Sequence, residues 1–189
     1  MNEAWKELKQ ACAQCHRCSL GETRHSLVFG DGAENARIML IGEGPGEQED
    51  RQGVPFVGPA GKLLDDMLEM IYLDRTKVYI ANIVKCRPPH NRDPLPEEQE
   101  ACIGWLRRQV ALVHPKIIVC LGRIAAMRQL DEESGDSSLD LRELLEDDIR
   151  RSKHYILKMK FRRALSGVGF CTLIAGLGGF LIYIIMQTL

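Results

Sequence analysis

The stretch Arg37-Ile-Met-Leu-Ile-Gly-Glu-Gly-Pro-Gly46 decides the fold. Its apolar run closes on a glycine, which is typical of a buried strand, and the glycine- and proline-rich segment that follows cannot continue as regular structure. We therefore expect a strand over 37–42 with a loop at its carboxyl end. Similar apolar runs predict strands over 77–84 and 116–121.

Helices are predicted around these strands. Apolar residues recur at helical spacing over 2–17 and 62–72, and Pro96-Glu-Glu begins a further helix that runs to about Val113. Strands that alternate with helices are typical of an α/β fold in which helices cover both faces of a parallel sheet. The sequence therefore predicts a three-layer α/β/α domain with a short central parallel sheet over residues 1–130.

The C-terminal part of the chain has a different composition. Residues 164–189 contain no Asp, Glu, Lys, Arg or His, and this run exceeds the ~20 residues that span a hydrocarbon core. We expect a transmembrane helix here, with a buried core helix as the alternative. Residues 131–163 are first acidic and then basic, and we expect them to form a partly helical linker. The basic flank predicts a cytoplasmic N-terminal domain that is anchored to a membrane.

The cysteines indicate a metal centre. There are seven, and the first residues of the chain lack an apolar signal segment, so we expect a reducing compartment. Cys15 and Cys18 form a Cys-x-x-Cys pair, whereas Cys86 and Cys102 lie far downstream. Four thiolates that the fold brings together suit zinc or an iron–sulfur cluster, and spacing alone leaves both open. Cys12 is either a spare thiol or an alternative ligand.

Five segments, in this order and spacing, resemble the type-4 uracil-DNA glycosylases: Cys15–Arg24, Arg37–Gly46, Gly53–Leu64, Ala81–Pro89 and Pro115–Arg123. The resemblance covers about residues 12–130. It implies the uracil-DNA glycosylase fold, a [4Fe–4S] cluster held by Cys15, Cys18, Cys86 and Cys102, and uracil-containing DNA as the substrate. The implied reaction is hydrolysis of the N-glycosidic bond of deoxyuridine, the first step of base excision repair.

The resemblance also assigns roles around the base, which such an enzyme must extrude from the DNA and hold. Phe56 matches the stacking aromatic and Asn82 the amide that reads the edge of uracil. Glu43 and Gly44 lie in the motif beside the scissile bond, where Glu43 is the candidate for positioning water. Glu49 belongs to the same motif and is a further candidate for substrate binding. Taken singly, each of these residues also has an ordinary structural explanation.

The pattern of the family is incomplete beyond about residue 130. Relatives continue to a His-Pro-Ser loop whose histidine stabilises the departing uracil, but residues 131–189 contain only His154, with no Pro-Ser after it. We therefore expect impaired activity. The alternative function is a non-catalytic, membrane-tethered iron–sulfur module that binds DNA or a partner, and a redox carrier is disfavoured because no second cluster motif appears.

Two further properties limit the possible partners. The formal net charge is −1, so any surface that binds DNA must be local rather than a property of the whole chain. Gly58-Pro-Ala-Gly-Lys62 resembles a phosphate-binding loop but lacks the first glycine and the final Ser or Thr of that motif. We expect no nucleotide cofactor, and the sequence does not indicate the oligomeric state.

Overall fold

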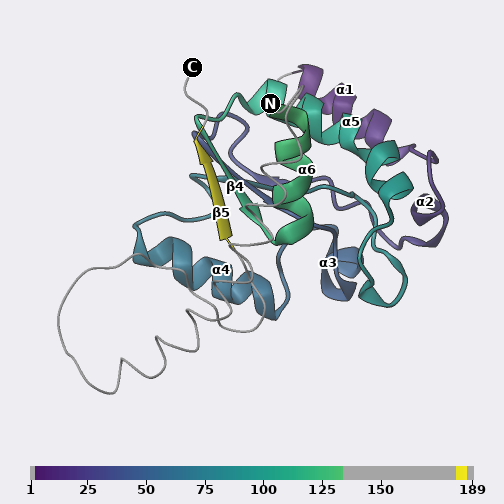
Figure 1. Ribbon diagram of the computed structural model, residues 1–189, viewed down its shortest axis with the longest axis horizontal. Coiled ribbons are helices and arrows are strands. Elements are labelled where there is room, and N and C mark those ends of the chain that lie inside the picture. The colour runs from purple at the N-terminus through teal and green to yellow at the C-terminus, as the bar shows by residue number, and fades with distance from the viewer. Residues whose placement is uncertain (1–2, 134–181, 187–189) are drawn as a thin grey trace.

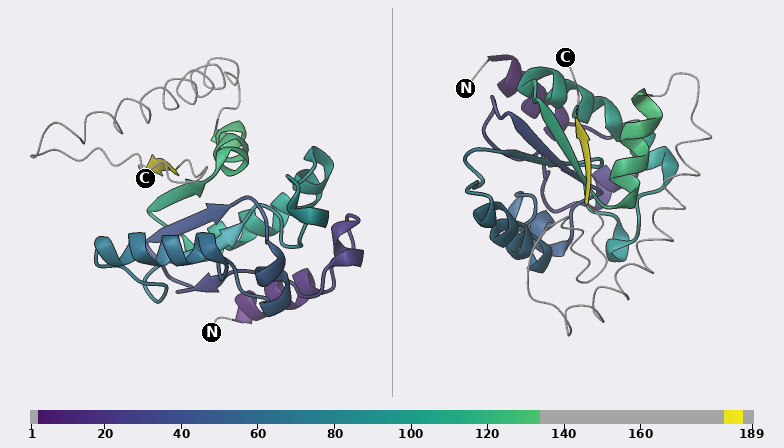
Figure 2. Two further views of the ribbon diagram at one scale, coloured as in Figure 1. Left: turned by 90° about the horizontal axis from the view of Figure 1, so that it is seen from below. Right: turned by 60° about the vertical axis from the view of Figure 1, so that its left-hand side comes forward.

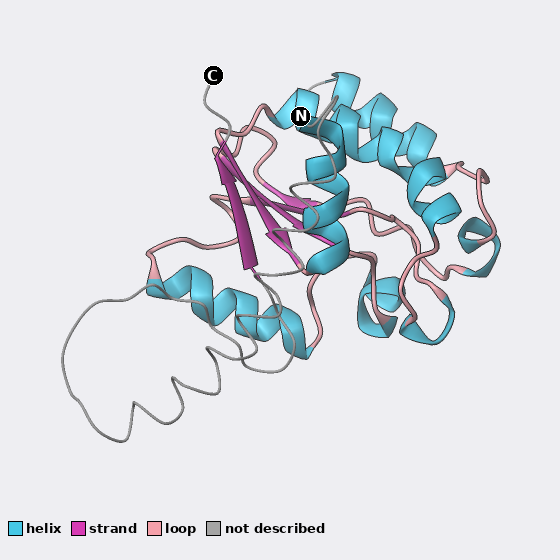
Figure 3. Cartoon of the chain, viewed as in Figure 1, coloured by secondary structure: helices cyan, strands magenta, loops and turns pink. Residues whose placement is uncertain are grey.

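The computed structural model describes residues 3–133 and 182–186, and these form an α/β fold around a five-stranded sheet (Figures 1 and 3). The strand order in the sheet is β1-β3-β2-β4-β5. In chain order the strands are β1 (Asp31–Gly32), β2 (Ile38–Gly42), β3 (Tyr79–Asn82), β4 (Ile117–Leu121) and β5 (Ile182–Met186). The predicted strands over 37–42, 77–84 and 116–121 are confirmed as β2, β3 and β4.

The sheet is mixed, which corrects the predicted parallel sheet. Its three central strands β3, β2 and β4 are parallel, but β1 pairs with β3 and β5 pairs with β4 in the antiparallel direction. A two-residue strand such as β1 has no periodicity that a sequence could reveal. The run Ile-Tyr-Ile-Ile-Met of β5 is as apolar as a membrane helix, and its β-branched residues suit a strand equally well.

Helices cover both faces of the sheet. Helices α1 and α5 lie side by side on one face, whereas α4 lies on the other (Figures 1 and 2). In chain order the helices are α1 (Glu3–Ala13), α2 (Leu20–Thr23), α3 (Glu47–Gln52), α4 (Pro59–Met70), the 3-10 turn η1 (Pro89–Asn91), α5 (Pro96–Val113) and α6 (Arg123–Glu133). The predicted helices over 2–17, 62–72 and from Pro96 to Val113 correspond to α1, α4 and α5.

Side chains of the central strands alternate between two apolar cores. Met39 and Ile41 pack in the core beneath α1 and α5, whereas Leu40 packs with Leu64 and Leu68 of α4. This alternation follows from the period of two in a strand, and burial of each such side chain stabilises the fold by about 1.5–3 kcal/mol. The sheet is therefore fixed from both sides.

The parallel register of β2 and β3 sets the position of the candidate site. Gly42 is the register partner of Asn82, and both residues stand at the carboxyl ends of their strands. The pairing continues into the loops, because Ile83 N donates to Gly42 O at 2.8 Å and Val84 N donates to Glu43 O at 3.2 Å. In open α/β sheets this edge is where ligands bind.

The start of α5 is fixed by a buried carboxylate. Glu98 is 2% exposed, and Arg92 donates two hydrogen bonds to it, at 2.7 and 2.8 Å. Leu95 N donates a third at 2.8 Å, which completes a capping box. These bonds from Arg92 lower the pKa of Glu98, so the carboxylate stays charged. Cys102 lies one helical turn further on, and its position is therefore set by this cap.

The C-terminal prediction needs a correction at the residues that the structure describes. Ile182–Met186 form strand β5, so the prediction that they belong to a transmembrane helix is wrong. The remaining predicted membrane residues, 164–181 and 187–189, lie outside the described part of the chain, as do linker residues 134–163. Within 3–133 and 182–186, no helix has both the length and the apolar composition to cross a bilayer.

Candidate functional site

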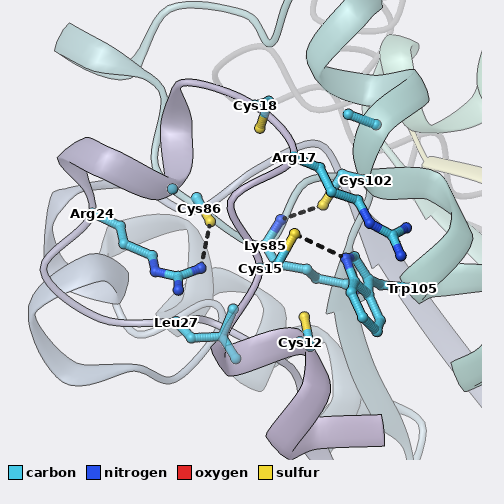
Figure 4. Close-up of a pocket in the computed structure, with 12 residues that line it drawn as sticks. Cys12, Cys15, Arg17, Cys18, Arg24, Leu27, Lys85, Cys86, Cys102 and Trp105 are labelled. Atoms are coloured by element: carbon cyan, nitrogen blue, oxygen red, sulfur yellow. Dashed lines mark hydrogen bonds between the residues drawn. The ribbon is translucent and has the colours of Figure 1, made fainter.

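The fold brings the distant cysteines to one pocket. Cys15 and Cys18 follow α1, Cys86 follows β3 and Cys102 lies on α5, and all four line the pocket (Figure 4). Cys12, from the end of α1, lines it as well. We call these five residues the cysteine pocket. The sequence prediction that the fold reunites the two pairs agrees with this arrangement.

Nitrogen donors point at the sulfurs of this pocket. Trp105 Nε1 lies 3.4 Å from Cys15 Sγ, Arg24 Nη1 lies 3.2 Å from Cys86 Sγ, and the backbone N of Lys85 lies 3.3 Å from Cys102 Sγ (Figure 4). N–H donors and cations stabilise a sulfur that carries negative charge. The surroundings of these three thiols therefore fit the thiolate form that a metal centre requires.

Without a metal, Cys12, Cys86 and Cys102 hold their protons. Burial raises the pKa of Cys12 to about 12 and that of Cys102 to about 11, and burial also raises the pKa of Cys86. Metal binding must therefore displace protons, as it does at thiolate sites in general. Among residues 3–133 and 182–186, no group of three or more His, Cys, Asp or Glu has the geometry to hold a single metal ion.

Lys85 connects the cysteine pocket to β3, and the sequence prediction missed it. Its side chain is fully buried, and its Nζ donates to Asn82 O at 2.8 Å. Burial lowers the pKa of Lys85 to about 8, while the sulfurs of Cys102, Cys12 and Cys86 act in the opposite direction. Its position in the sequence could have indicated this role. Lys85 follows an apolar strand and directly precedes a candidate metal ligand, and a solvated lysine is unusual at such a position.

The second candidate site, which we call the amide site, consists of Gly42, Phe56 and Asn82. A methyl group added at Gly42 would lie 2.4 Å from Asn82 Oδ1 and 2.6 Å from Phe56 Cζ. The ring and the amide therefore meet at Gly42, where only a glycine leaves room for both. The structure thus brings together the two residues that the sequence predicted to hold the base.

Asn82 carries an acceptor that the protein leaves unused. The residue is 1% exposed, and its Oδ1 is buried without a hydrogen-bond partner among the described residues. An unpaired buried acceptor costs about 1–3 kcal/mol of stability, so such atoms are rare and each one requires an explanation. The amide site therefore lacks a donor, and a planar base with an N–H on its edge would supply one.

Glu49 holds two loops together. Its Oε1 accepts hydrogen bonds from Val57 N at 2.9 Å and Gly58 N at 2.8 Å, and its Oε2 accepts one from Gly46 N at 3.1 Å. The carboxylate thus joins the end of the Gly42–Gly46 loop to the loop that carries Phe56. Its predicted contact with substrate stays a prediction, and the structure adds a positioning role through backbone N–H groups.

Glu43 and Gly44 follow β2 directly. Ile124 N, at the start of α6, donates to Glu43 Oε1 at 2.9 Å. Burial raises the pKa of Glu43, and this is the largest of the effects on it. A methyl group at Gly44 would lie 2.8 Å from Val84 Cγ2, so a larger residue would require Val84 to move. The carboxylate is therefore held by a helix start and is more basic than a solvated glutamate.

A family model and several relatives match this chain. The model of the Uracil DNA glycosylase superfamily matches residues 29–166, which extends past residue 130, where the recognised motifs end. A type-4 uracil-DNA glycosylase of Archaeoglobus fulgidus is 50% identical over 124 residues, covering 66% of this chain and 62% of the relative.

Two further type-4 uracil-DNA glycosylases are similar. The one from Sulfurisphaera tokodaii is 41% identical over 84% of this chain and 69% of its own length. The one from Thermotoga maritima is 46% identical over 65% of this chain and 64% of its own length. The chain thus spans about two thirds of the length of these relatives. It belongs to the Uracil DNA glycosylase superfamily and, within it, to the type-4 uracil-DNA glycosylases.

Proposed function

We propose that this protein recognises uracil in DNA and removes it by hydrolysis of the N-glycosidic bond. The observation that carries the proposal is the amide site, where the Phe56 ring and the unpaired Asn82 Oδ1 meet at Gly42. Membership of the type-4 uracil-DNA glycosylases supports the same assignment. The chain spans only part of its relatives, so the activity of the whole protein is our inference.

The amide site suits uracil better than cytosine. Uracil carries an N–H at N3, and this donor would satisfy the buried Asn82 Oδ1. Cytosine has a lone pair at N3, which would leave two acceptors facing each other in a place that excludes water. A buried acceptor without a donor costs about 1–3 kcal/mol, so the geometry penalises cytosine while Phe56 stacks on any pyrimidine.

Glu43 is our candidate for holding the attacking water. Its Oε1 accepts the Ile124 N–H, and no hydrogen bond to Oε2 is found among the described residues, so Oε2 remains for a water molecule. The burial that raises the pKa of Glu43 makes it a stronger proton acceptor. Negative charge builds on uracil as it leaves, and the family resemblance implies that the histidine of a His-Pro-Ser loop stabilises that charge; residues 131–189 contain no such motif. We therefore propose slow turnover.

We propose that Cys15, Cys18, Cys86 and Cys102 hold a [4Fe–4S] cluster. Support comes from their shared pocket, from the N–H donors at three of the sulfurs and from the family resemblance. When bound, the cluster would supply bonds that tie the segment after α1 to the end of β3 and to α5. Its role is then structural, because it would fix the N-terminal segment against the sheet. Zinc is the competing occupant.

We also propose that the C-terminal part attaches the protein to a membrane, with the domain on the cytoplasmic side. The support is the uncharged run from residue 164 and the basic residues before it. Because Ile182–Met186 pair with β4 of the same domain, residues 164–181 would have to enter and leave the membrane on the side of the domain, without crossing it.

The cluster proposal predicts that iron depends on four cysteines. After anaerobic purification, single Cys→Ser changes at positions 15, 18, 86 and 102 should each lower iron and acid-labile sulfide, because a thiolate ligand is lost. The matched control is Cys12→Ser, which changes a thiol of the same pocket and should retain both. Full retention of iron in the Cys86 or Cys102 variant, or zinc in place of iron throughout, would contradict the assignment.

The amide site predicts separate effects on binding and turnover. Phe56→Ala should weaken binding to a uracil-containing single strand by ~1–3 kcal/mol, the usual worth of one base–aromatic stack. Asn82→Asp should reduce discrimination between uracil and cytosine. Excision should be slower than in a relative with the His-Pro-Ser loop by ~10²–10³, the usual effect of one missing donor.

Filter binding and an excision assay on the same oligonucleotides measure these quantities. Tyr72→Ala is the matched control, because this aromatic is 90% exposed beyond the end of α4 and should leave binding unchanged. Excision as fast as in the relative would show that another donor replaces the missing histidine. Absence of any preference for uracil would favour the non-catalytic binding module.

The membrane proposal predicts that the full-length protein resists extraction of membranes with alkaline carbonate. Ile174→Arg should release it, because an arginine is strongly disfavoured in the apolar part of a bilayer, and this variant keeps Ile182–Met186 in the chain. The control Ile174→Leu should remain in the pellet. A full-length protein that stays in the supernatant would refute membrane attachment.

A further inference from the structure

We infer that Arg75 is a positioning residue that fixes the Phe56 ring for stacking on the base, an inference that rests on the proposed recognition of uracil. Arg75 lies in the loop between α4 and β3, outside the segments that carry the family resemblance.

Phe56 has a backbone conformation that an aromatic residue rarely adopts. Its φ angle is +54°, in the left-handed region where the Cβ of an L-residue is crowded by the following carbonyl. Such a conformation persists only when the surroundings enforce it, and it is found most often at functional sites. The groups that enforce it here therefore determine where the ring points.

Arg75 binds the two carbonyls at this point of the chain. Its Nη1 donates to Pro55 O at 2.9 Å, and its Nη2 donates to Phe56 O. Asp65 of α4 holds the guanidinium in turn, since Arg75 Nε donates to Asp65 Oδ1 at 2.7 Å. A planar guanidinium with fixed donor directions sets the orientation of both peptide groups, which the compact ammonium of a lysine does not.

The same loop is held on its other sides by close packing and by Glu49. A methyl group at Gly61 would lie 1.7 Å from Phe56 O, so the first turn of α4 presses against the carbonyl that Arg75 binds. Glu49 Oε1 accepts hydrogen bonds from the N–H groups of Val57 and Gly58. The carbonyls on both sides of the Phe56 Cα and the two N–H groups that follow it are thus fixed, and the ring remains to extend toward Gly42.

Arg75 can influence uracil binding at the amide site only through its hydrogen bonds to Phe56 and the adjacent residue. Its hydrogen bonds among the described residues go to Pro55, Phe56 and Asp65, and none goes to Gly42 or Asn82. Its effect on uracil must therefore disappear when the Phe56 ring is removed. A residue that merely stabilises the fold would show the same effect with and without that ring, so the two roles are separable.

A double-mutant cycle tests the inference on the full-length protein. The probe is a single-stranded oligonucleotide with one 2′-fluoro-deoxyuridine, whose fluorine slows glycosidic cleavage so that binding is measured alone. Arg75→Ala should weaken binding on the order of tenfold, within the range of a lost base–aromatic stack. In the Phe56→Ala background the same change should weaken binding by less than about twofold. Arg75→Lys and Asp65→Asn should give intermediate losses.

Arg128→Ala is the matched control. Arg128 is exposed to a similar extent, 20% against 24% for Arg75, and pairs with Glu100 in the way that Arg75 pairs with Asp65. It should leave binding of the probe unchanged in both backgrounds. Equal losses from Arg75→Ala with and without the Phe56 ring would overturn the inference, because they would show a general structural role.

Amide hydrogen exchange separates a failure of this inference from a failure of the proposed function. Arg75→Ala should speed exchange at Val57 and Gly58, the N–H groups that Glu49 binds, and Arg128→Ala should not. If exchange is unchanged by Arg75→Ala, Arg75 does not hold the loop and the inference fails. If exchange speeds up but the unmodified protein shows no preference for uracil, Arg75 does hold the loop that carries Phe56, and it is the proposed function that fails.

Discussion

The buried ammonium of Lys85 is the constraint on which both sites depend. A cation without water around it is costly unless hydrogen bonds and opposite charges replace that water. Lys85 Nζ donates a hydrogen bond to Asn82 O, at the end of β3, and the cysteine sulfurs supply the favourable electrostatic effect once metal binding has removed their protons. Its backbone N–H also points at Cys102 Sγ. A shift of β3 or of the cysteine pocket would therefore leave this charge without compensation.

The consequence is that the two sites form one unit. Asn82 and Cys86 are four residues apart in the sequence, and Lys85 contacts the backbone of the first and the cysteine pocket that contains the second. The opposite wall of the amide site has its own supports, since Glu49 holds the N–H groups beside Phe56. An amide and a ring that are fixed before the base arrives lose little freedom on binding, which is the basis of preorganised recognition.

The sequence revealed the parts that obey strong local rules. Strands β2, β3 and β4 are apolar runs closed by turns, α5 begins with Pro96 and two acids, and the Cys15–Cys18 spacing is typical of a metal site. Local sequence patterns did not predict the elements and residues whose role depends on tertiary contacts. Strand β5 exists because β4 offers an open edge, and no hydropathy pattern separates such a strand from a membrane helix. Lys85 and Arg75 act through contacts with residues whose proximity only the fold creates.

The roles assigned to Phe56 and Asn82 all require that the amide site holds uracil. The most direct measurement is a crystal structure of the anaerobically purified full-length protein with uracil. We expect the pyrimidine ring on the face of Phe56, with its N3–H within hydrogen-bonding distance of Asn82 Oδ1, the buried acceptor that has no partner among the described residues. Uracil bound elsewhere, or an Asn82 amide that remains unpaired while uracil is present, would show that the amide site does not hold the base.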